Sequence, residues 1–227
     1  MPVEPFEKHA ARYERWFEEH ELAYRSELEA VRWMLPRSGR GLEVGVGSAR
    51  FAAPLGITIG VDPSLALGRI ARQRGVRVVA AVGENLPFKS ESFDFVLMVT
   101  TLCFLDDVAR AFAEVFRVLK QGGVFVNGFV DRESTLGRLY QRRKDQSVFY
   151  RAATFFSVAE AAQEMRRAGF RNPRFCQTLF SLPSELRAVE QPRAGFGEGA
   201  FVVISATKPR RTRWDDAPAV RMTSEGR

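Results

Sequence analysis

The stretch 41–62 is the sequence feature that most constrains the fold. Its apolar beginning leads into a turn that contains Gly45 and Gly47, and a second apolar run ends on the acid Asp62. A strand, a glycine turn, a helix over 48–55 and a second strand match this order, which is half of a nucleotide-binding βαβ unit. The start of that helix would direct free N–H groups at an anionic ligand group, and Asp62 would accept hydrogen bonds from ribose hydroxyls.

Three departures from the dinucleotide-binding pattern narrow the choice of ligand. Arg50 stands three residues after Gly47, where that pattern requires a third small residue. An acid, Glu43, lies inside the first strand, two residues before Gly45. The turn also has no lysine followed by serine or threonine, which excludes a phosphate-binding P-loop. A hydride-transferring dehydrogenase is therefore disfavoured.

Length and composition predict one globular domain with a small appendage at most. The chain has 227 residues, of which 45% are hydrophobic and 27% charged, enough to bury a sizeable core. No apolar run is long enough to predict a membrane span, and Glu4 and Glu7 argue against a secretory signal. Two cysteines are too few for a disulfide framework or a zinc site, so we expect no metal and a cytoplasmic location.

The net charge of +7 is concentrated in two segments. Lysine and arginine outnumber the acids in residues 132–151 and again in residues 208–227, and the rest of the chain is neutral overall. An exposed helix face explains the first segment, and a disordered basic tail explains the second. We therefore consider nucleic acid an improbable partner.

Alternating helices and strands predict an α/β fold. Helices are expected over residues 6–35 (as two helices), 48–55, 64–74, 106–120 and 157–169, and strands over 57–61, 76–80, 95–99, 124–130, 170–180 and 200–207. This alternation predicts a parallel sheet with right-handed crossovers. The predicted organisation is a helical cap or lid over 1–36, a main domain over 37–207 with a lid insertion of basic and aromatic residues at 131–156, and the tail at 208–227.

Three motifs in order resemble those of the class I S-adenosylmethionine (SAM) dependent methyltransferases. They are Glu43-x-Gly45-x-Gly47, the segments Gly-Glu-Asn-Leu-Pro-Phe (83–88) and Ser-Phe-Asp (92–94), and the turn Val-Leu-Lys-Gln-Gly-Gly (118–123). The chain is most similar to the small-molecule branch that includes the type 11 and ubiquinone/menaquinone methyltransferases. The resemblance implies a Rossmann-like, doubly wound sheet of seven strands in the order 3-2-1-4-5-7-6, with the last strand antiparallel and helices on both faces.

The resemblance also implies SAM as the cofactor, S-adenosylhomocysteine as its product, and roles for single residues. The backbone from Gly45 to Gly47 would hold the amino and carboxylate groups of the methionine part, and Glu43 would brace the turn. Asp62 would bind the ribose hydroxyls, and Pro63 would lie beside the adenine.

Four further residues are expected near the cofactor. Gly83 and Glu84 would flank the adenine edge, although Val82 stands where many relatives carry an aspartate that binds the adenine amino group. Thr100, just after the fourth strand, would border the methionine part and the substrate cleft. Tyr13, on the aromatic-rich N-terminal helices, is expected to cover the cofactor as part of a lid.

The substrate is expected beyond the carboxyl ends of the central strands, where open α/β sheets bind their ligands. Candidate substrate residues are Thr101, Phe104, Arg132, Tyr140 and Tyr150. Methyl transfer from a sulfonium mainly requires alignment and a dry cleft, with a general base only for a poor nucleophile. The two histidines, His9 and His20, are more typical of helix surfaces, so no catalytic residue is assigned.

Several classes of methyl acceptor are disfavoured because the sequence lacks the motifs that they require. The sequence after the fourth strand lacks the Asn/Asp-Pro-Pro-Phe/Tyr motif of base-amino methylation, and there is no Pro-Cys pair for cytosine methylation. The leading prediction is a methyltransferase that acts on a small molecule. Two alternatives stay open, namely an RNA- or ribosome-linked methyltransferase that uses the basic insertion, and a SAM-binding regulatory module without catalysis.

Overall fold

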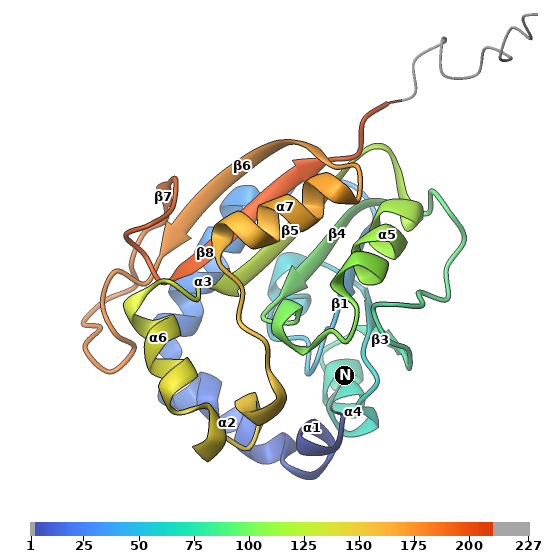
Figure 1. The fold of residues 1–227 in the computed structure, drawn as a ribbon. Coiled ribbons are helices and arrows are strands. Elements are labelled where there is room, and N and C mark those ends of the chain that lie inside the picture. Colours follow the sequence, from blue (N-terminus) through green and yellow to red (C-terminus); the bar gives the residue numbers. More distant parts are fainter. Residues whose placement is uncertain (1–2, 211–227) are drawn as a thin grey trace, which may run out of the picture.

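A single mixed β-sheet runs through the centre of the protein, which the computed structural model describes for residues 3–210 (Figure 1). Its strands are β1 (Gly41–Val44), β2 (Ile59–Val61), β3 (Arg77–Val79), β4 (Phe93–Val99), β5 (Leu119–Val130), β6 (Arg171–Thr178), β7 (Arg193–Ala194) and β8 (Phe201–Thr207). They lie in the order β3-β2-β1-β4-β5-β8-β6-β7. The neighbours from β3 to β5 are parallel, and β8 is antiparallel to both β5 and β6.

The predicted fold class is confirmed. The observed order matches 3-2-1-4-5-7-6 when β8 takes the place of the seventh, antiparallel strand. The sheet has one strand more than expected, because the two-residue β7 pairs with the edge strand β6. This short strand lies in the segment between the last two predicted strands, where no strand was expected.

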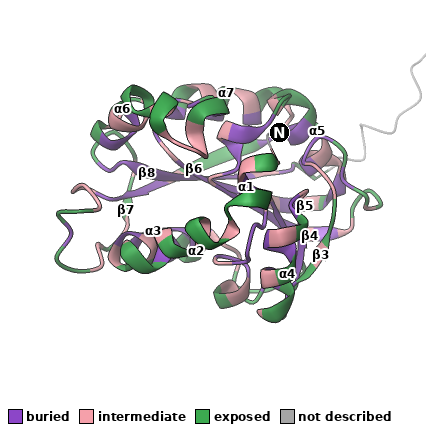
Figure 2. Ribbon diagram, turned by 90° about the horizontal axis from the view of Figure 1, so that it is seen from below, coloured by how far each residue is buried: buried purple, intermediate pink, exposed green. Residues whose placement is uncertain are grey.

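Helices cover both faces of the sheet (Figure 2). They are α1 (Glu4–Lys8), α2 (Ala10–Glu19), α3 (Glu21–Met34), α4 (Leu65–Gln73), α5 (Val108–Val118), α6 (Thr135–Arg142) and α7 (Val158–Arg167). One apolar core packs α5 and α7 against the sheet through residues such as Phe112 and Met165. A second core on the opposite face includes Val31 of α3 and Ala71 of α4. Burial on both faces explains why the central strands are continuously apolar.

Three helices begin at the capping residues that their sequences provide. The side chains of Ser64, Asp107 and Ser157 accept hydrogen bonds from backbone N–H groups in the first turns of α4, α5 and α7. Ser157 forms a reciprocal capping box with Glu160. These helix starts were predicted to within two residues. The strand β5, however, begins earlier than predicted, at Leu119, because its register with β4 shifts ahead of Val124.

The expected helix over 48–55 is wrong. The structure has a series of turns there and a single 3₁₀ turn, Ala53–Leu55. Ala49 has a φ of 63°, which a right-handed helix does not allow, and Pro54 has no N–H to donate. An α-helix N-terminus is therefore absent from this turn, and any ligand must be held by the turn's own backbone.

The N-terminal segment forms three helices instead of the two expected, because the chain bends at both histidines. His9 and His20 are the junction residues, with φ values of −121° and −123°. The ring of His20 stacks on Trp16, with the ring centroids 5.0 Å apart, and its Nδ1 lies 3.1 Å from the Trp16 carbonyl oxygen. His20 therefore has a structural role at a helix end.

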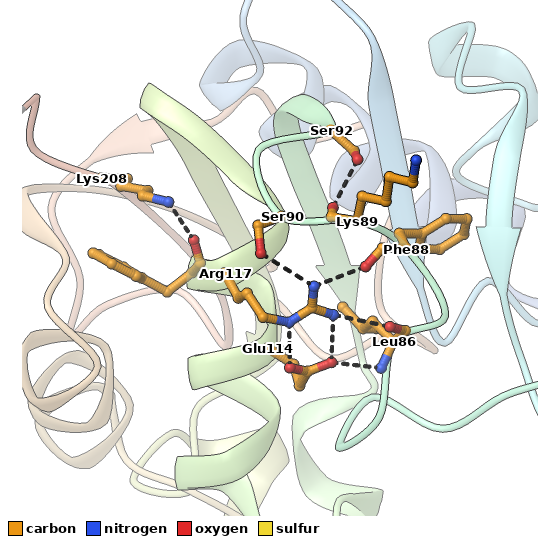
Figure 3. Close-up of polar contacts among 9 residues, drawn as sticks. Leu86, Phe88, Lys89, Ser90, Ser92, Glu114, Arg117 and Lys208 are labelled. Carbon is orange, nitrogen blue, oxygen red and sulfur yellow. Dashed lines mark hydrogen bonds and ion pairs between the residues drawn. The ribbon is translucent and has the colours of Figure 1, made fainter.

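A clamp around Arg117 holds the motif loop at the amino ends of the central strands (Figure 3). Arg117 donates hydrogen bonds to the carbonyl oxygens of Leu86 and Phe88 at 2.9 and 2.7 Å, and it pairs with Glu114 at 2.6 Å. Glu114 in turn accepts from the Leu86 N–H at 2.8 Å. The clamp fixes the loop that carries the second motif onto α5.

Lys208 corrects the boundary of the predicted tail. This residue is buried, and its Nζ donates to the carbonyl oxygens of Phe116 and Leu119 at 2.9 and 2.7 Å (Figure 3). The packed part of the chain therefore extends past the last strand. Most of the predicted basic tail, residues 211–227, lies outside the described residues.

Candidate active site

The glycine turn after β1 is built so that only glycine suits its two key positions. Gly45 and Gly47 have φ values of 73° and 50°. A Cβ on Gly45 would lie 2.1 Å from Oγ1 of Thr101, and a Cβ on Gly47 would lie 2.9 Å from the Tyr13 hydroxyl. Both values are below any real contact, so the turn brings its backbone directly against its neighbours.

Asp62 lies at the end of β2, as predicted, and fixes the shape of the turn. Its two carboxylate oxygens accept hydrogen bonds from the backbone N–H groups of Gly47 and Ser64, each at 2.8 Å. Burial raises the pKa of Asp62, and these two hydrogen bonds oppose that rise. Each oxygen keeps a further lone pair, so the carboxylate can still accept from a ligand hydroxyl.

Glu43 lies beneath the turn on β1 and is almost fully buried. Burial raises its pKa well above the usual value, and the nearby charge of Asp62 adds to the rise, whereas a backbone hydrogen bond from Ala52 opposes it. Within residues 3–210, its Oε2 has no hydrogen-bond partner. A buried oxygen without a partner is expensive, so this group is one that a ligand, directly or through water, would satisfy.

Thr100 is held in a strained conformation at the carboxyl end of β4. Its φ is 50°, which is uncommon for a β-branched residue, and its N–H donates to Gly128 at 2.8 Å. The next residue, Thr101, donates from its hydroxyl to the carbonyl oxygen of Val99 at 3.0 Å. The bend directs the chain around the glycine turn.

The N-terminal helices are fastened over the turn by ion pairs that sequence reasoning missed. Glu14 of α2 pairs with Arg50 at 2.7 Å and with Arg74, and Arg74 also donates to the Ser48 carbonyl oxygen at 2.7 Å. Burial raises the pKa of Glu14, but the hydrogen bonds from the two arginines and Ser48 lower it more. Arg50, which broke the dinucleotide pattern, is thus part of this brace.

A second fastening joins α1 to the start of α4. The Glu7 carboxylate accepts from the hydroxyl of Ser64 at 2.8 Å and from the backbone N–H of Ala66 at 3.1 Å. These hydrogen bonds lower the pKa of Glu7. The contacts that fasten α1 and α2 join residues at least 26 positions apart in the chain, so no local pattern could have revealed them.

A small cavity of about 40 Å³ lies at the turn and brings most of the predicted cofactor residues together. Its lining includes Gly45, Gly47, Asp62, Pro63, Thr100 and Thr101, together with Phe6, Tyr13 and Phe104. Thr101, which we assigned to the substrate, thus lies with the cofactor group. A space of this size holds a few waters at most.

Gly83 and Glu84 are not among the lining residues of this cavity. The Oε1 atom of Glu84 accepts from the backbone N–H groups of Asp106 and Asp107 at 2.8 and 3.4 Å, which braces the loop before α5. Its Oε2 is buried and has no partner among residues 3–210. Gly83 packs near Leu105. Their contact with an adenine stays a prediction.

A larger cavity of about 580 Å³ adjoins the turn and is lined mainly by aromatic rings. Phe6, Tyr13, Trp16 and Phe17 come from α1 and α2, Phe104 follows β4, and Tyr140, Phe149 and Tyr150 come from the insertion. Tyr150 stacks on Phe104 and on Tyr140, with centroids 5.9 and 5.2 Å apart. Three of the predicted substrate residues, Phe104, Tyr140 and Tyr150, therefore line one space.

Arg132 does not line either cavity, in contrast to the prediction. Its guanidinium pairs with Glu160 of α7 at 2.9 Å and donates to the Phe155 carbonyl oxygen at 3.4 Å. This pairing points the side chain toward the start of α7. These contacts hold the insertion against α7, and a contact of Arg132 with the substrate stays a prediction.

Glu27 of α3 is the functional candidate that sequence reasoning missed. It lines the aromatic cavity, is only 4% exposed, and burial raises its pKa to about 8. A signal was available, because Ala23, Glu27, Val31 and Met34 share the buried face of one helix. An acid at such a position is unusual and indicates a specific role.

The comparisons with known proteins agree with this geometry. The crystal structure of a Thermotoga maritima SAM-dependent methyltransferase, described as a possible histamine N-methyltransferase, superposes with a TM-score of 0.89 at 56% identity, covering 90% of this chain and 99% of that one. This chain belongs to the class I SAM-dependent methyltransferases. Residues 42–127 of the methyltransferase also match the methyltransferase domain family. SAM is its cofactor, and the orphaned Glu43 oxygen and the glycine cradle fit that ligand.

Two further relatives differ in how much of the methyltransferase they match. An uncharacterized protein of Methanocaldococcus jannaschii is 45% identical over 203 residues, which is 89% of this chain and 98% of that protein. The demethylmenaquinone methyltransferase of Roseiflexus castenholzii is 39% identical over 99 residues, only 39% of this chain and 41% of that enzyme. None of the helices in residues 3–210 is both long and apolar enough to cross a membrane.

Proposed function

We propose that this methyltransferase transfers the methyl group to a small molecule held in the aromatic cavity. The observation that carries the proposal is that this cavity and the turn cavity share four lining residues, Phe6, Tyr13, Thr100 and Phe104. An acceptor among the aromatic rings would therefore lie next to a ligand on the glycine turn. A volume of about 580 Å³ is typical of a small-molecule site.

The chain's part in the reaction is binding, alignment and exclusion of water. Gly45, Gly47, Glu43, Asp62 and Pro63 would hold SAM, with Gly83, Glu84 and Tyr13 around it. When bound, SAM supplies a methyl group already activated by its sulfonium. The aromatic walls would orient the acceptor and keep the cleft dry, which is the main requirement for this displacement.

The names of two relatives support a small acceptor. The Thermotoga neighbour is described as a possible histamine N-methyltransferase and covers nearly the whole chain. The Roseiflexus relative is a demethylmenaquinone methyltransferase but matches well under half of the chain. Both names describe small molecules, which is consistent with the cavity, and neither describes a nucleic acid.

The test is methyl transfer from SAM labelled in its methyl group. The purified protein would be incubated with pools of small amines, phenols and quinols, and in parallel with total RNA. We expect label in the low-mass fraction only, and we expect Tyr140→Ala to reduce it at least tenfold by opening the cavity wall, whereas the exposed Arg138→Ala leaves it unchanged. Label in RNA but not in any small molecule would overturn the proposal in favour of the RNA-linked alternative.

A further inference from the structure

The aromatic cavity contains one buried carboxyl group for which the described residues, 3–210, provide no partner. Glu27 is 4% exposed, and within residues 3–210 it has no hydrogen bond or ion pair. Its neighbours on the same face of α3, Ala23 and Val31, are apolar and fully buried. Burying an acid without a partner is strongly unfavourable. The group is therefore maintained for something that enters the cavity.

Among residues 3–210, the charged and titratable groups that line the inner cavity around Glu27 include no cation. Tyr140 and Tyr150 of the insertion face it, and burial followed by the negative charge of Glu27 raises the pKa of Tyr140. Tyr13 of α2 lines the same cavity and its pKa is also raised by burial. Arg12, Arg15 and Glu19 of α2 line the cavity too, but all three are exposed, at its rim.

An anionic group surrounded by aromatic rings is a recognised environment for an organic cation. Ring faces attract ammonium groups through their quadrupoles, and the attraction grows when the cation is desolvated. A carboxylate adds a charge-assisted hydrogen bond, which a neutral alcohol or quinol could not match in strength. Tyr150 already stacks with both Phe104 and Tyr140 around this space.

We propose that the methyl acceptor is a small aromatic amine, which binds as its ammonium form to Glu27 and loses one proton to that carboxylate before methylation. This inference rests on the proposed function, since it names the acceptor class of the same cavity. Glu27 then has two roles, as the specificity-determining residue and as the general base.

Protons and electrons balance in this methyl transfer. Glu27 removes one N–H proton, which leaves the amine neutral with a free lone pair. The nitrogen lone pair forms the new N–C bond to the methyl carbon, while the S–C bond breaks and its electron pair stays on sulfur. The product leaves as an N-methylammonium ion, and the Glu27 carboxyl later releases its proton to water. Its pKa of about 8 suits this exchange near neutral pH.

The first experiment compares amines with neutral counterparts by calorimetry, in the presence of S-adenosylhomocysteine. The probes are 2-phenylethylamine, tyramine and histamine, each beside the alcohol that replaces its amino group. We expect the protein to bind at least one amine tenfold or more tightly than its alcohol. Glu27→Gln should remove that preference without weakening alcohol binding, and Glu21→Gln, the same change at an exposed site of α3, should leave it intact.

Proton release provides a second readout that a purely structural role would not change. Because the raised pKa leaves Glu27 largely protonated at pH 7, ammonium binding should expel roughly half a proton or more per amine, measured in buffers of different ionisation enthalpy. Glu27→Gln should expel none. Glu27→Asp, which keeps the carboxyl, should retain part of the release. These measurements need no turnover and no knowledge of the natural acceptor.

The outcomes separate this inference from the function on which it rests. Equal binding of amines and alcohols, or an amine preference that survives in Glu27→Gln, would overturn the inference. Label transfer to a phenol or a quinol but to no amine would also overturn it, while the small-molecule methyltransferase would stand. Label in RNA alone would remove both.

Discussion

The two adjoining cavities of this methyltransferase differ in how they are made. The turn cavity of about 40 Å³ is shaped by backbone, with Gly45, Gly47 and Asp62 all within one short stretch of chain. The aromatic cavity of about 580 Å³ is assembled from side chains of α2, α3, the loop after β4 and the insertion. The comparison teaches that the glycine turn and its acid are local properties of the sequence, whereas the aromatic cavity, where we propose that the acceptor binds, is a property of tertiary packing.

The difference in size also has a cause in the structure. Phe6 and Tyr13 of the N-terminal helices line the turn cavity, and the Tyr13 hydroxyl lies close against Gly47. A nucleoside ligand needs more room than about 40 Å³, so we expect α1 and α2 to shift when SAM enters. The predicted lid role can therefore be tested as a movement of α1 and α2, which the contacts of Glu7 and Glu14 hold over the turn.

The largest expected effect comes from breaking the backbone-defined cavity with Gly45→Ala. The new methyl group would meet Thr101 at 2.1 Å at a φ of 73°, so we expect a loss of stability of about 3 kcal/mol and SAM binding weakened at least a hundredfold. The matched control is Gly56→Ala, which has the same φ but no atom within 4 Å. It should cost about 1 kcal/mol and bind SAM normally. Equal binding by both variants, measured by calorimetry, would contradict the local origin of this site.

The next effect is expected from replacing Glu27, the buried acid of the aromatic cavity, which sharpens the contrast between the two cavities. Glu27 has its pKa raised to about 8 by burial, so it contributes its full stability below about pH 4.5 and loses it as the pH rises through 8. Glu27→Gln should therefore match the wild type near pH 4.5 and exceed it by about 4 kcal/mol at pH 8.5. Melting curves across this range check the sign, with Glu21→Gln as the control. A constant difference at all pH values would show that Glu27 is not buried as the structure has it.

A smaller effect is expected from loosening α2, the helix whose Tyr13 lines both cavities. Glu14→Gln should loosen α2 by about 1 kcal/mol, because two arginine pairs are weakened at a half-buried site. Hydrogen exchange of residues 4–19 should become faster in this variant and slower when S-adenosylhomocysteine binds. Glu18→Gln, whose exposed pair with Arg50 is 3.8 Å long, is the control. Exchange that does not respond to the ligand would argue against a lid.

The smallest effect tests the RNA-linked alternative. Replacing Arg142, Arg143 and Lys144 by alanine should change methyl transfer to a small molecule by less than about twofold, because the charges of two exposed side chains and one half-buried side chain contribute little there. If RNA were the substrate, its binding would fall steeply with salt and these three residues would share the loss. Filter binding between 50 and 200 mM salt, about the range over which phosphate contacts are lost, distinguishes the two cases.

Most of the fold could be predicted from the sequence because it depends on local patterns. Apolar runs gave the central strands, and Ser64, Asp107 and Ser157 marked helix starts that the structure confirms. The prediction of a helix over 48–55 failed because packing around the turn imposes a positive φ on Ala49. The helix propensity of alanine gives no indication of such a conformation. The edge strand β7 was missed because a strand of two residues is too short to show an alternating hydrophobic pattern.

The sequence by itself determined the alternation of strands and helices, the glycine turn and the acid at the end of β2, since each depends on residues close together in the chain. The strand order was implied by the resemblance to a known family, because it depends on pairings between distant segments, such as β1 with β4 and β5 with β8. Only the tertiary structure decided which side chains line the aromatic cavity. It turned Arg132 away to Glu160, fastened Glu14 to Arg50 and Arg74, and placed Glu27 among aromatic rings from distant segments. The physical reason is that a concave, desolvated site needs walls from several elements, and their meeting is fixed by packing, which no single stretch of sequence encodes.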